Sequence, residues 1–365
     1  MKIQAVETYS TQDISVCRVV SDDGAEGWGQ LAPYNADIAS TVLHRQVAPH
    51  VLGCDPLDTE AITDRVLEAE HKFPGSYVCR ALAGVDTALW DLRGRLEGRS
   101  VASLLGGGAG PVPVYASSMR RDITGADEAA RLADLAARDG HWAFKVRVGE
   151  ENGHDHEPWP GRSAEVVGAV RQALGGEARL LVDANGGFTP SKAIETGQML
   201  QDHGVVHFEE PCPYWELDWT REVRAALDLD VAGGEQDVAM PVWQRMIRER
   251  VVDVVQPDIC YVGGLTRALR VARLAADAGL PVVPHSANLS LVTVFTLHLM
   301  AALENAGPYV EYSIEPDSYY PFQAGLFHPA LRVADGQVAL SDAPGWGVEV
   351  ARDWLDRAHR HVTRA

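Results

Sequence analysis

The run Leu181-Val182-Asp183-Ala184-Asn185-Gly186-Gly187-Phe188 joins an apolar stretch directly to a carboxylate and then to two glycines. This order is typical of a buried β-strand that ends at Asp183 and passes into a tight turn. Taken alone, such an aspartate is most simply explained as the N-cap of a following helix. The rest of the chain changes this interpretation, because the same pattern returns twice more.

Two further apolar runs also end in acids. Val205-Val206-His207-Phe208 leads into Glu209, and Asp230-Val231-Ala232-Gly233-Gly234 leads into Glu235. The steps from Asp183 to Glu209 and from Glu209 to Glu235 are both 26 residues long. One strand, one helix and their two loops need about this length. The repeat therefore predicts three neighbouring parallel strands whose acidic ends meet at one edge.

Three carboxylates at one edge repel one another unless a cation lies between them. Oxygen-only ligands favour a hard ion, with Mg²⁺ as the first candidate. We therefore predict one Mg²⁺ per subunit, bound by Asp183, Glu209 and Glu235. The regular step makes this metal site a better explanation than three independent helix caps.

The pattern on either side of these strands predicts an α/β fold class. Residues 106–326 alternate eight expected strands with seven helices, which indicates a (β/α)7β modified TIM barrel. Residues 1–105 show three strands and then three helices, an α+β N-terminal capping domain. We expect the tail, residues 327–365, to carry two strands and a last helix and to complete the capping domain by packing back on it. The barrel strands are expected near residues 112–117, 142–148, 179–183, 205–209, 230–235, 252–257, 281–284 and 309–313.

Composition limits the partners and the compartment. The chain has 365 residues, 46% of them hydrophobic, and a net charge of −19, so nucleic acid and anionic membranes are poor partners. No signal core or membrane span is present, and the cysteines show no CxxC pair and no disulfide spacing. We expect a cytoplasmic homo-oligomer, from dimer to octamer, whose partner is a small molecule. The five cysteines are Cys17, Cys54, Cys79, Cys212 and Cys260.

More reactive groups follow the other expected barrel strands. Lys145 and Arg147 stand two residues apart on one strand, so both face the barrel mouth. One unit after Glu235 comes Asp258, and His285 follows 27 residues later. A carboxylate that binds an imidazole fixes its tautomer and raises its basicity. This pair therefore predicts a general base, although a single histidine after a strand is more often structural.

The remaining candidate residues lie on the eighth strand and on loops at the same edge. Glu311 lies 26 residues after His285, and we expect it among the catalytic groups. The loop 152–162 could close the site or remain a solvated surface loop, and its His154-x-His156 pair could also hold a second metal. The residues expected to bind substrate are Tyr34, Asn35, His154, Asn185 and Glu235.

These groups together suit one type of reaction. A cation cluster binds an anionic substrate, a divalent metal polarises its carboxylate, and a base removes the neighbouring proton. The sequence therefore predicts abstraction of the proton alpha to a carboxylate, with His285 as the base.

The ordered motifs resemble those of the enolase superfamily, mandelate racemase subgroup, over nearly the whole chain. The resemblance implies a capping domain over a (β/α)7β barrel, Mg²⁺ on the three predicted ligands, and His285 with Asp258 as a catalytic dyad. A Lys or His base used with Mg²⁺ is already a known feature of that superfamily. The motifs are Lys145-Val146-Arg147, Asp183-Ala184-Asn185, Glu209-Glu210-Pro211, Gly234-Glu235, Gln256-Pro257-Asp258, His285, Gly84-Val85-Asp86-Thr87-Ala88-Leu89-Trp90-Asp91 and Leu104-Leu105-Gly106-Gly107.

One motif departs from the subgroup, which has Lys-x-Lys with the second lysine as a base. This chain has Arg147 there, and a guanidinium stays protonated. A racemase needs a base on each face of the α-carbon, whereas a dehydratase can use His285 alone. We therefore expect a lyase that dehydrates a sugar acid to a 2-keto-3-deoxy acid.

Three kinds of alternative remain open. A racemase or epimerase could use Lys145 as its replacement base, and a cycloisomerase would share the same chemistry. A metal-dependent hydrolase belongs to another class, but hydrolytic zinc sites rely on histidine ligands. A non-catalytic sugar-acid binding protein would not need a His–Asp pair.

Overall fold

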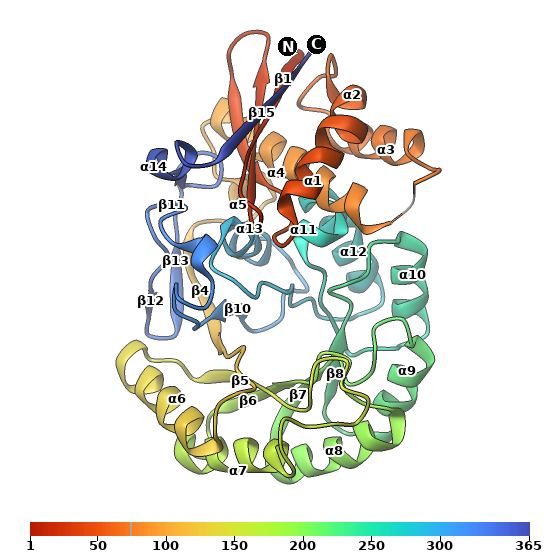
Figure 1. Cartoon of the computed structure of the whole chain (residues 1–365), viewed down its shortest axis with the longest axis vertical. Helices are drawn as coiled ribbons and strands as arrows, with labels where there is room; N and C mark the ends of the chain where they lie inside the picture. Colours follow the sequence, from red (N-terminus) through yellow and green to blue (C-terminus); the bar gives the residue numbers. More distant parts are fainter. Residues whose placement is uncertain (74) are drawn as a thin grey trace.

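The computed structural model describes residues 1–73 and 75–365. A sheet with helices forms one unit, and a ring of strands with outer helices forms a second unit below it (Figure 1). In the first unit β1 (Ile3–Ser10), β2 (Ser15–Ser21) and β3 (Glu26–Gln30) pair antiparallel in that order. The helical segments that follow are α1 (Ala36–Val42), η1 (Leu43–Val47), α2 (Ala48–Val51), α3 (Thr59–Ala69), α4 (Ser76–Glu97) and α5 (Val101–Leu104).

Helix α4 lies close against strand β3 because two glycines remove the side chains that would separate them. A Cβ atom on Gly27 would come within 2.1 Å of the carbonyl oxygen of Ala88. One on Gly29 would come within 2.3 Å of Thr87 Oγ1. No other residue fits at either position without moving the helix backbone or Thr87.

The same elements fix the first unit on the second. Thr266 N donates to Asp86 Oδ2 at 3.1 Å, and Trp90 Nε1 donates to Thr266 Oγ1 at 3.0 Å. From strand β3, Gln30 Nε2 donates to Ser290 Oγ at 2.8 Å. These buried hydrogen bonds hold α4 over the barrel.

The second unit is the predicted (β/α)7β barrel, which confirms the fold class. Its parallel strands are β4 (Gly110–Ser117), β5 (Ala143–Arg147), β6 (Arg179–Asp183), β7 (Val205–Glu209), β8 (Asp230–Gly233), β9 (Val254–Val255) and β10 (Val310–Ser313), which pairs with β4. Its helices are α6 (Gly125–Asp139), α7 (Arg162–Leu174), α8 (Pro190–Asp202), α9 (Leu217–Ala226), α10 (Met240–Arg248), α11 (Ile259–Val262), α12 (Leu265–Asp277) and α13 (Leu291–Met300).

The strand expected at 281–284 is reduced to isolated bridges. Val282 pairs with Val255 on one side and with Ala306 on the other. Pro281 and Pro284 flank these bridges, and proline has no N–H for a strand ladder. The ring still closes through the bridges, so His285 follows at the expected edge.

The tail differs from the prediction in two ways. The hairpin β12 (Val333–Ala334) and β13 (Gln337–Leu340) pairs with barrel strand β4 rather than with the first unit. The expected last helix is only the short α14 (Arg352–Leu355), and the chain then forms β15 (His359–Arg364), which pairs with β1. The other tail elements are β11 (Phe327–His328) and β14 (Glu349–Val350), and η2 (Pro321–Gln323) lies just before the tail. Domain boundaries at 105 and 326 remain a prediction.

All five cysteines are free. Within residues 1–73 and 75–365, no helix combines the length and the apolar character that crossing a bilayer requires.

Candidate active site

A cavity of about 610 Å³ opens where the first unit covers the barrel. The predicted site residues divide into those that line it and those that lie behind its wall. Tyr34, Asn35, Arg147, Asn185, Glu235 and His285 line the cavity. Lys145, Asp183, Glu209, Asp258 and Glu311 are buried behind them.

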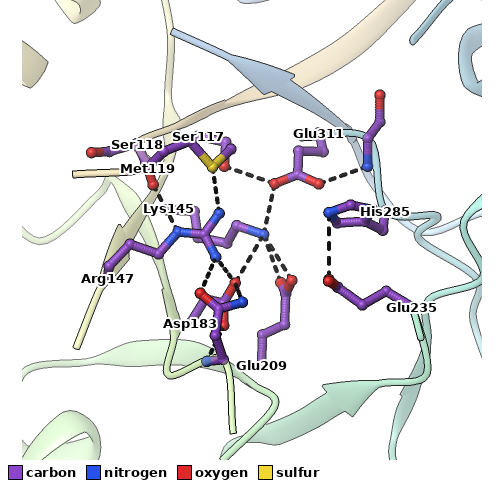
Figure 2. A network of polar contacts seen from close by, with 12 residues as sticks. Ser117, Ser118, Met119, Lys145, Arg147, Asp183, Glu209, Glu235, His285 and Glu311 are labelled. Atoms are coloured by element: carbon purple, nitrogen blue, oxygen red, sulfur yellow. Dashed lines mark hydrogen bonds and ion pairs between the residues drawn. The ribbon is translucent and has the colours of Figure 1, made fainter. Parts of the chain in front are cut away.

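Lys145 lies at the centre of a buried network of ion pairs (Figure 2). Its Nζ is 2.8 Å from Glu209 Oε2, 2.7 Å from Glu311 Oε1 and 3.8 Å from Asp183 Oδ2. Burial alone would raise the pKa of Glu311, but Lys145, His285 and Arg147 together outweigh it and lower that pKa to about 2. Lys145 thus faces the barrel interior as predicted, but it is fully buried and does not reach the cavity wall.

Arg147, two residues further along β5, does reach the wall. Its guanidinium hydrogen-bonds the carboxylate of Asp183, donates to Asn185 Oδ1 at 3.0 Å, and donates to the Ser118 carbonyl at 2.9 Å. Burial opposes the charged form, yet nearby carboxylates led by Glu209 raise the pKa of Arg147 above its usual value. The side chain is therefore a permanent cation, which makes it unsuitable as a base.

The structure brings His285 and Asp258 into direct contact. His285 Nδ1 lies 2.8 Å from Asp258 Oδ2, and the other carboxylate oxygen accepts from the backbone N–H of Cys260 at 2.7 Å and of Tyr261 at 2.9 Å. His285 Nε2 lies 3.5 Å from Glu235 Oε2. Burial favours the neutral imidazole, but Glu235 and Asp258 outweigh it and raise the pKa of His285 to about 10.

Buried acids outnumber buried bases around this centre. Glu210 Oε1 has no hydrogen-bond partner among the described residues. Burial, helped by Glu235 and Glu209, raises the pKa of Glu210 well above its usual range. Excess negative charge on oxygen donors fits a hard divalent cation such as Mg²⁺. The acids are Asp183, Glu209, Glu210, Glu235, Asp258 and Glu311, and the bases are Lys145, Arg147 and His285.

The three predicted metal ligands follow neighbouring strands but are not grouped around one point. Asp183 is opposite Glu209 in the register of β6 and β7, and Glu235 follows β8. In the described part of the chain, no three His, Cys, Asp or Glu side chains are arranged to hold an ion. Asp183 and Glu209 instead make ion pairs with Arg147 and Lys145, because a buried carboxylate needs a positive partner. Their role as ligands remains a prediction.

The loop 152–162 reaches the cavity with Asn152, but His154 is not where a substrate-binding residue was expected. His154 is exposed and does not line the cavity, whereas Glu151 and Asn152 of the same turn do. The His154-x-His156 pair is not part of any three-residue group that could hold a metal among the described residues.

Two arginines that the sequence reading missed also line the cavity. Arg121 follows β4 and donates from Nη2 to Asn185 Oδ1 at 2.7 Å. The basic pair Arg120-Arg121 directly after the first barrel strand was a usable signal for it. Arg80 comes from the first turns of α4, outside the motif Gly84–Asp91 that marks this helix, so the sequence holds no local signal for it.

Family models match both units of the chain. The model described as enolase C-terminal domain-like matches residues 127–354. The model described as mandelate racemase / muconate lactonizing enzyme, N-terminal domain, matches residues 2–106.

Two curated proteins are similar over nearly the whole length. The chain is 33% identical to D-galactarolactone cycloisomerase of Agrobacterium fabrum, over 92% of this chain and 88% of that protein. It is 30% identical to L-talarate/galactarate dehydratase of Salmonella typhimurium, over 93% of this chain and 82% of that protein.

Solved structures are similar over full length as well. A protein from Roseobacter denitrificans, named only provisionally as a racemase, is 55% identical with a TM-score of 0.99 over 100% of both chains. A mandelate racemase/muconate lactonizing protein from Paracoccus denitrificans PD1222, solved in complex with magnesium, is 29% identical with a TM-score of 0.89. That match covers 100% of this chain and 98% of the other.

Proposed function

Because this chain belongs to the enolase superfamily, mandelate racemase subgroup, we propose that it dehydrates a sugar acid to a 2-keto-3-deoxy acid. The observation that carries the proposal is the contact of 2.8 Å between His285 Nδ1 and Asp258 Oδ2. It orients an imidazole on the cavity wall, with Nε2 directed towards Glu235 Oε2 at 3.5 Å on the side where a substrate would bind. The similarity to the dehydratase from Salmonella typhimurium supports dehydration as the reaction. Both curated relatives are named as enzymes, which supports an enzymatic function for this chain.

Asp183, Glu209 and Glu235 are the residues that would hold Mg²⁺. When bound, the ion supplies positive charge that makes the proton next to the substrate carboxylate more acidic. The magnesium complex of the Paracoccus denitrificans protein supports this choice of ion. The charge of Glu235 is also one of the main causes that raise the pKa of His285, together with Asp258 and Glu311. As a metal ligand, Glu235 would share its negative charge with the ion and would raise the pKa of His285 less, so His285 could be neutral and accept a proton.

The positions of the side chains around the cavity assign the proton transfers to particular residues. His285 takes the α-proton on Nε2, while Asp258 keeps the Nδ1 proton in place. The same Nε2 returns its proton to the β-hydroxyl group, which leaves as water. Arg147, on the cavity wall, stabilises the negative charge that develops on the substrate carboxylate, and Lys145 acts on it from behind the wall, where it pairs with Glu209 and Glu311.

A cycloisomerase is the second candidate, because the relative from Agrobacterium fabrum carries that name and a cycloisomerase needs only one base. A racemase has less support, although the Roseobacter denitrificans structure is named that way, since Arg147 cannot act as the second base. Dehydration is therefore the proposed reaction, and cycloisomerisation is the alternative.

The test is to incubate the Mg²⁺-loaded protein with a panel of sugar acids in D₂O. NMR follows the α-proton, and mass spectrometry follows the product. Loss of one water with a 2-keto-3-deoxy product supports the proposal, whereas a product of unchanged mass identifies the cycloisomerase. Exchange with inversion and no new product identifies a racemase. No α-proton exchange with any acid rejects this chemistry altogether.

A further inference from the structure

Arg80 lies on the cavity wall and has no acidic partner among residues 1–73 and 75–365. Among the ion pairs of the described residues, none includes Arg80, and its side chain makes no hydrogen bond within that part of the chain. Arg121 also lacks an ion pair there, but its guanidinium already donates to Asn185 Oδ1 and to the Gly149 carbonyl. Arg80 is therefore the arginine whose donors remain available to a ligand.

The position of Arg80 is set by α4 and by one aromatic ring. Ser76, Tyr77 and Arg80 line the cavity from the first turns of this helix. Arg80 Cζ lies 3.8 Å from the centroid of the Tyr261 ring. A guanidinium stacked on an aromatic face is held in orientation and keeps the N–H groups on its edge free for a carboxylate.

Tyr261 also connects Arg80 to the proposed base. The ring centroids of Tyr261 and His285 are 5.8 Å apart. Arg80 Cζ lies 3.8 Å from the Tyr261 ring centroid, which lies 5.8 Å from the His285 ring centroid. These two distances added together are the largest possible separation between Arg80 Cζ and the His285 ring. An extended chain of six carbons spans roughly 6 Å at ~1.2 Å per bond, and a hydrogen bond of about 2.8 Å to a side chain at each end supplies the remainder, so a sugar acid of about six carbons can bridge Arg80 and His285.

The carboxylate next to the reacting carbon has other partners. Arg147 and Lys145 lie on β5, and the predicted metal ligands follow the adjacent strands β6 to β8. Arg80 belongs to the covering unit, so it is not required at that end of the substrate. The guanidinium of Arg80 is suited to bind a second negative charge at the end of the substrate that is remote from the reacting carbon.

We propose that Arg80 binds a second carboxylate at the far end of the substrate, so that the enzyme selects diacid sugars over monoacid sugars. This inference rests on the proposed function and names its substrate class. The N-terminal end of α4 adds a favourable dipole for the same negative charge.

The test compares kcat/KM for pairs of six-carbon sugar acids that have the same configuration, one diacid and one monoacid in each pair. For the best pair we expect the native enzyme to prefer the diacid by on the order of 10–100-fold, the usual value of a charged hydrogen-bonded contact. Arg80→Gln should move this ratio close to one, mainly through a higher KM for the diacid, because the contact is remote from the reacting carbon. Arg80→Lys should keep part of the preference.

Arg93→Gln is the matched control, since Arg93 lies on the same helix and pairs with Glu97 at 2.8 Å on the surface. It should keep the native ratio. A native preference for monoacids, or an Arg80→Gln ratio equal to the native one, overturns the proposal and leaves the dehydratase assignment intact.

Absence of turnover with every acid would instead reject the proposed function. Calorimetric binding of the same acid pairs to native protein and Arg80→Gln then decides the role of Arg80. Tighter binding of the diacid that is lost in the variant supports the proposal, and equal binding overturns it.

Discussion

The guanidinium of Arg147 is hydrogen-bonded to the carboxylate of Asp183, the residue that ends β6. Both side chains are buried, and Arg147 is anchored further by the Ser118 carbonyl. A group that keeps its proton thus occupies the second basic position of β5. With Arg147 at this position, the barrel has one candidate base, His285, where the Lys-x-Lys motif would supply a second.

Arg147→Lys is expected to provide that second base. A buried lysine can lose its proton, whereas a guanidinium cannot. We expect part of the recovered substrate to be inverted at the α-carbon, as measured by chiral chromatography. Arg147→Met, which removes the charge without adding a base, should invert none. Recovered substrate of unchanged configuration from an Arg147→Lys enzyme that still turns over would contradict the one-base account.

Mg²⁺ is expected to raise the unfolding temperature of the protein. An ion that binds only the folded state stabilises it by about 2.7 kcal/mol at one hundred times its Kd. Calorimetric melts with and without Mg²⁺ measure the shift, and Glu235→Gln should reduce it. Superimposable melts of the native protein with and without Mg²⁺ would show that Asp183, Glu209 and Glu235 do not form the site. Chelation should also stop α-proton exchange.

His285→Asn is expected to lose roughly 10²–10⁴-fold in turnover, the usual contribution of a general base. The variant should still bind Mg²⁺ and substrate, but it should not exchange the α-proton in D₂O. Asp258→Asn, which disturbs only the orientation and tautomer of the imidazole, is the matched comparison and should lose less. Exchange at the native rate in His285→Asn without product would assign the base to Lys145 or another group.

Lys145→Ala is expected to lower both stability and turnover. It leaves Glu209 and Glu311 buried without their shared cation, and breaking such a pair costs about 3–5 kcal/mol. Urea unfolding measures this loss. Adding Glu311→Gln to Lys145→Ala removes one unpaired charge and should recover part of the stability. The idea fails if Lys145→Ala unfolds at the native urea concentration.

The same variant bears on the role of Lys145 in turnover. A cation that acts on charge developing in the transition state affects kcat more than KM. We therefore expect Lys145→Ala to lower kcat more than it raises KM. An unchanged kcat with a higher KM would mean that Lys145 stabilises only the bound substrate.

Acid is expected to destabilise the fold through His298 on α13. Its Nδ1 accepts from Ala102 N at 3.1 Å, and its Nε2 donates to the Trp346 carbonyl at 3.0 Å. Burial lowers the pKa of His298 from 6.5 to about 4. Its stabilising contribution is therefore complete above pH 6.5 and disappears as the pH falls towards 4, a total of about 3 kcal/mol.

Urea unfolding of native protein and His298→Gln at pH 7 and pH 5 measures this contribution. The variant should lose less stability between the two pH values than the native protein does. His154→Gln changes an exposed histidine and should behave like the native protein. An equal pH dependence in His298→Gln and native protein would rule out His298 as the cause. His44 has a pKa lowered to about 4 by burial as well, so some dependence should remain.

The sequence predicted well those features that depend on strand period. β6 ends at Asp183 and β7 at Glu209, and the step from Asp258 to His285 brings the two side chains together. The alternation of side chains along a strand determines which way its last residue faces. The sequence spacing of these residues was therefore sufficient to predict that they lie at the same end of the barrel.

Features that depend on how side chains pack could not be predicted from the spacing of residues in the sequence. Arg80 reaches the cavity because α4 crosses the barrel, and its contact with Tyr261 joins distant parts of the chain. The carboxylates of Asp183 and Glu209 both lie near Lys145 Nζ, and Asp183 also pairs with Arg147, a pairing that the sequence did not predict. Backbone spacing does not determine such pairings.

The pairing of β15 with β1 has a consequence for how the protein is made. β1 has β2 on one side and β15 on the other. Because a chain leaves the ribosome from its N-terminus, the outer edge of β1 stays open until residues 359–364 have been synthesised. An open strand edge can recruit a strand from another chain. The unit that emerges first is therefore the last to be completed, and loss of β15 would expose newly made chains to aggregation.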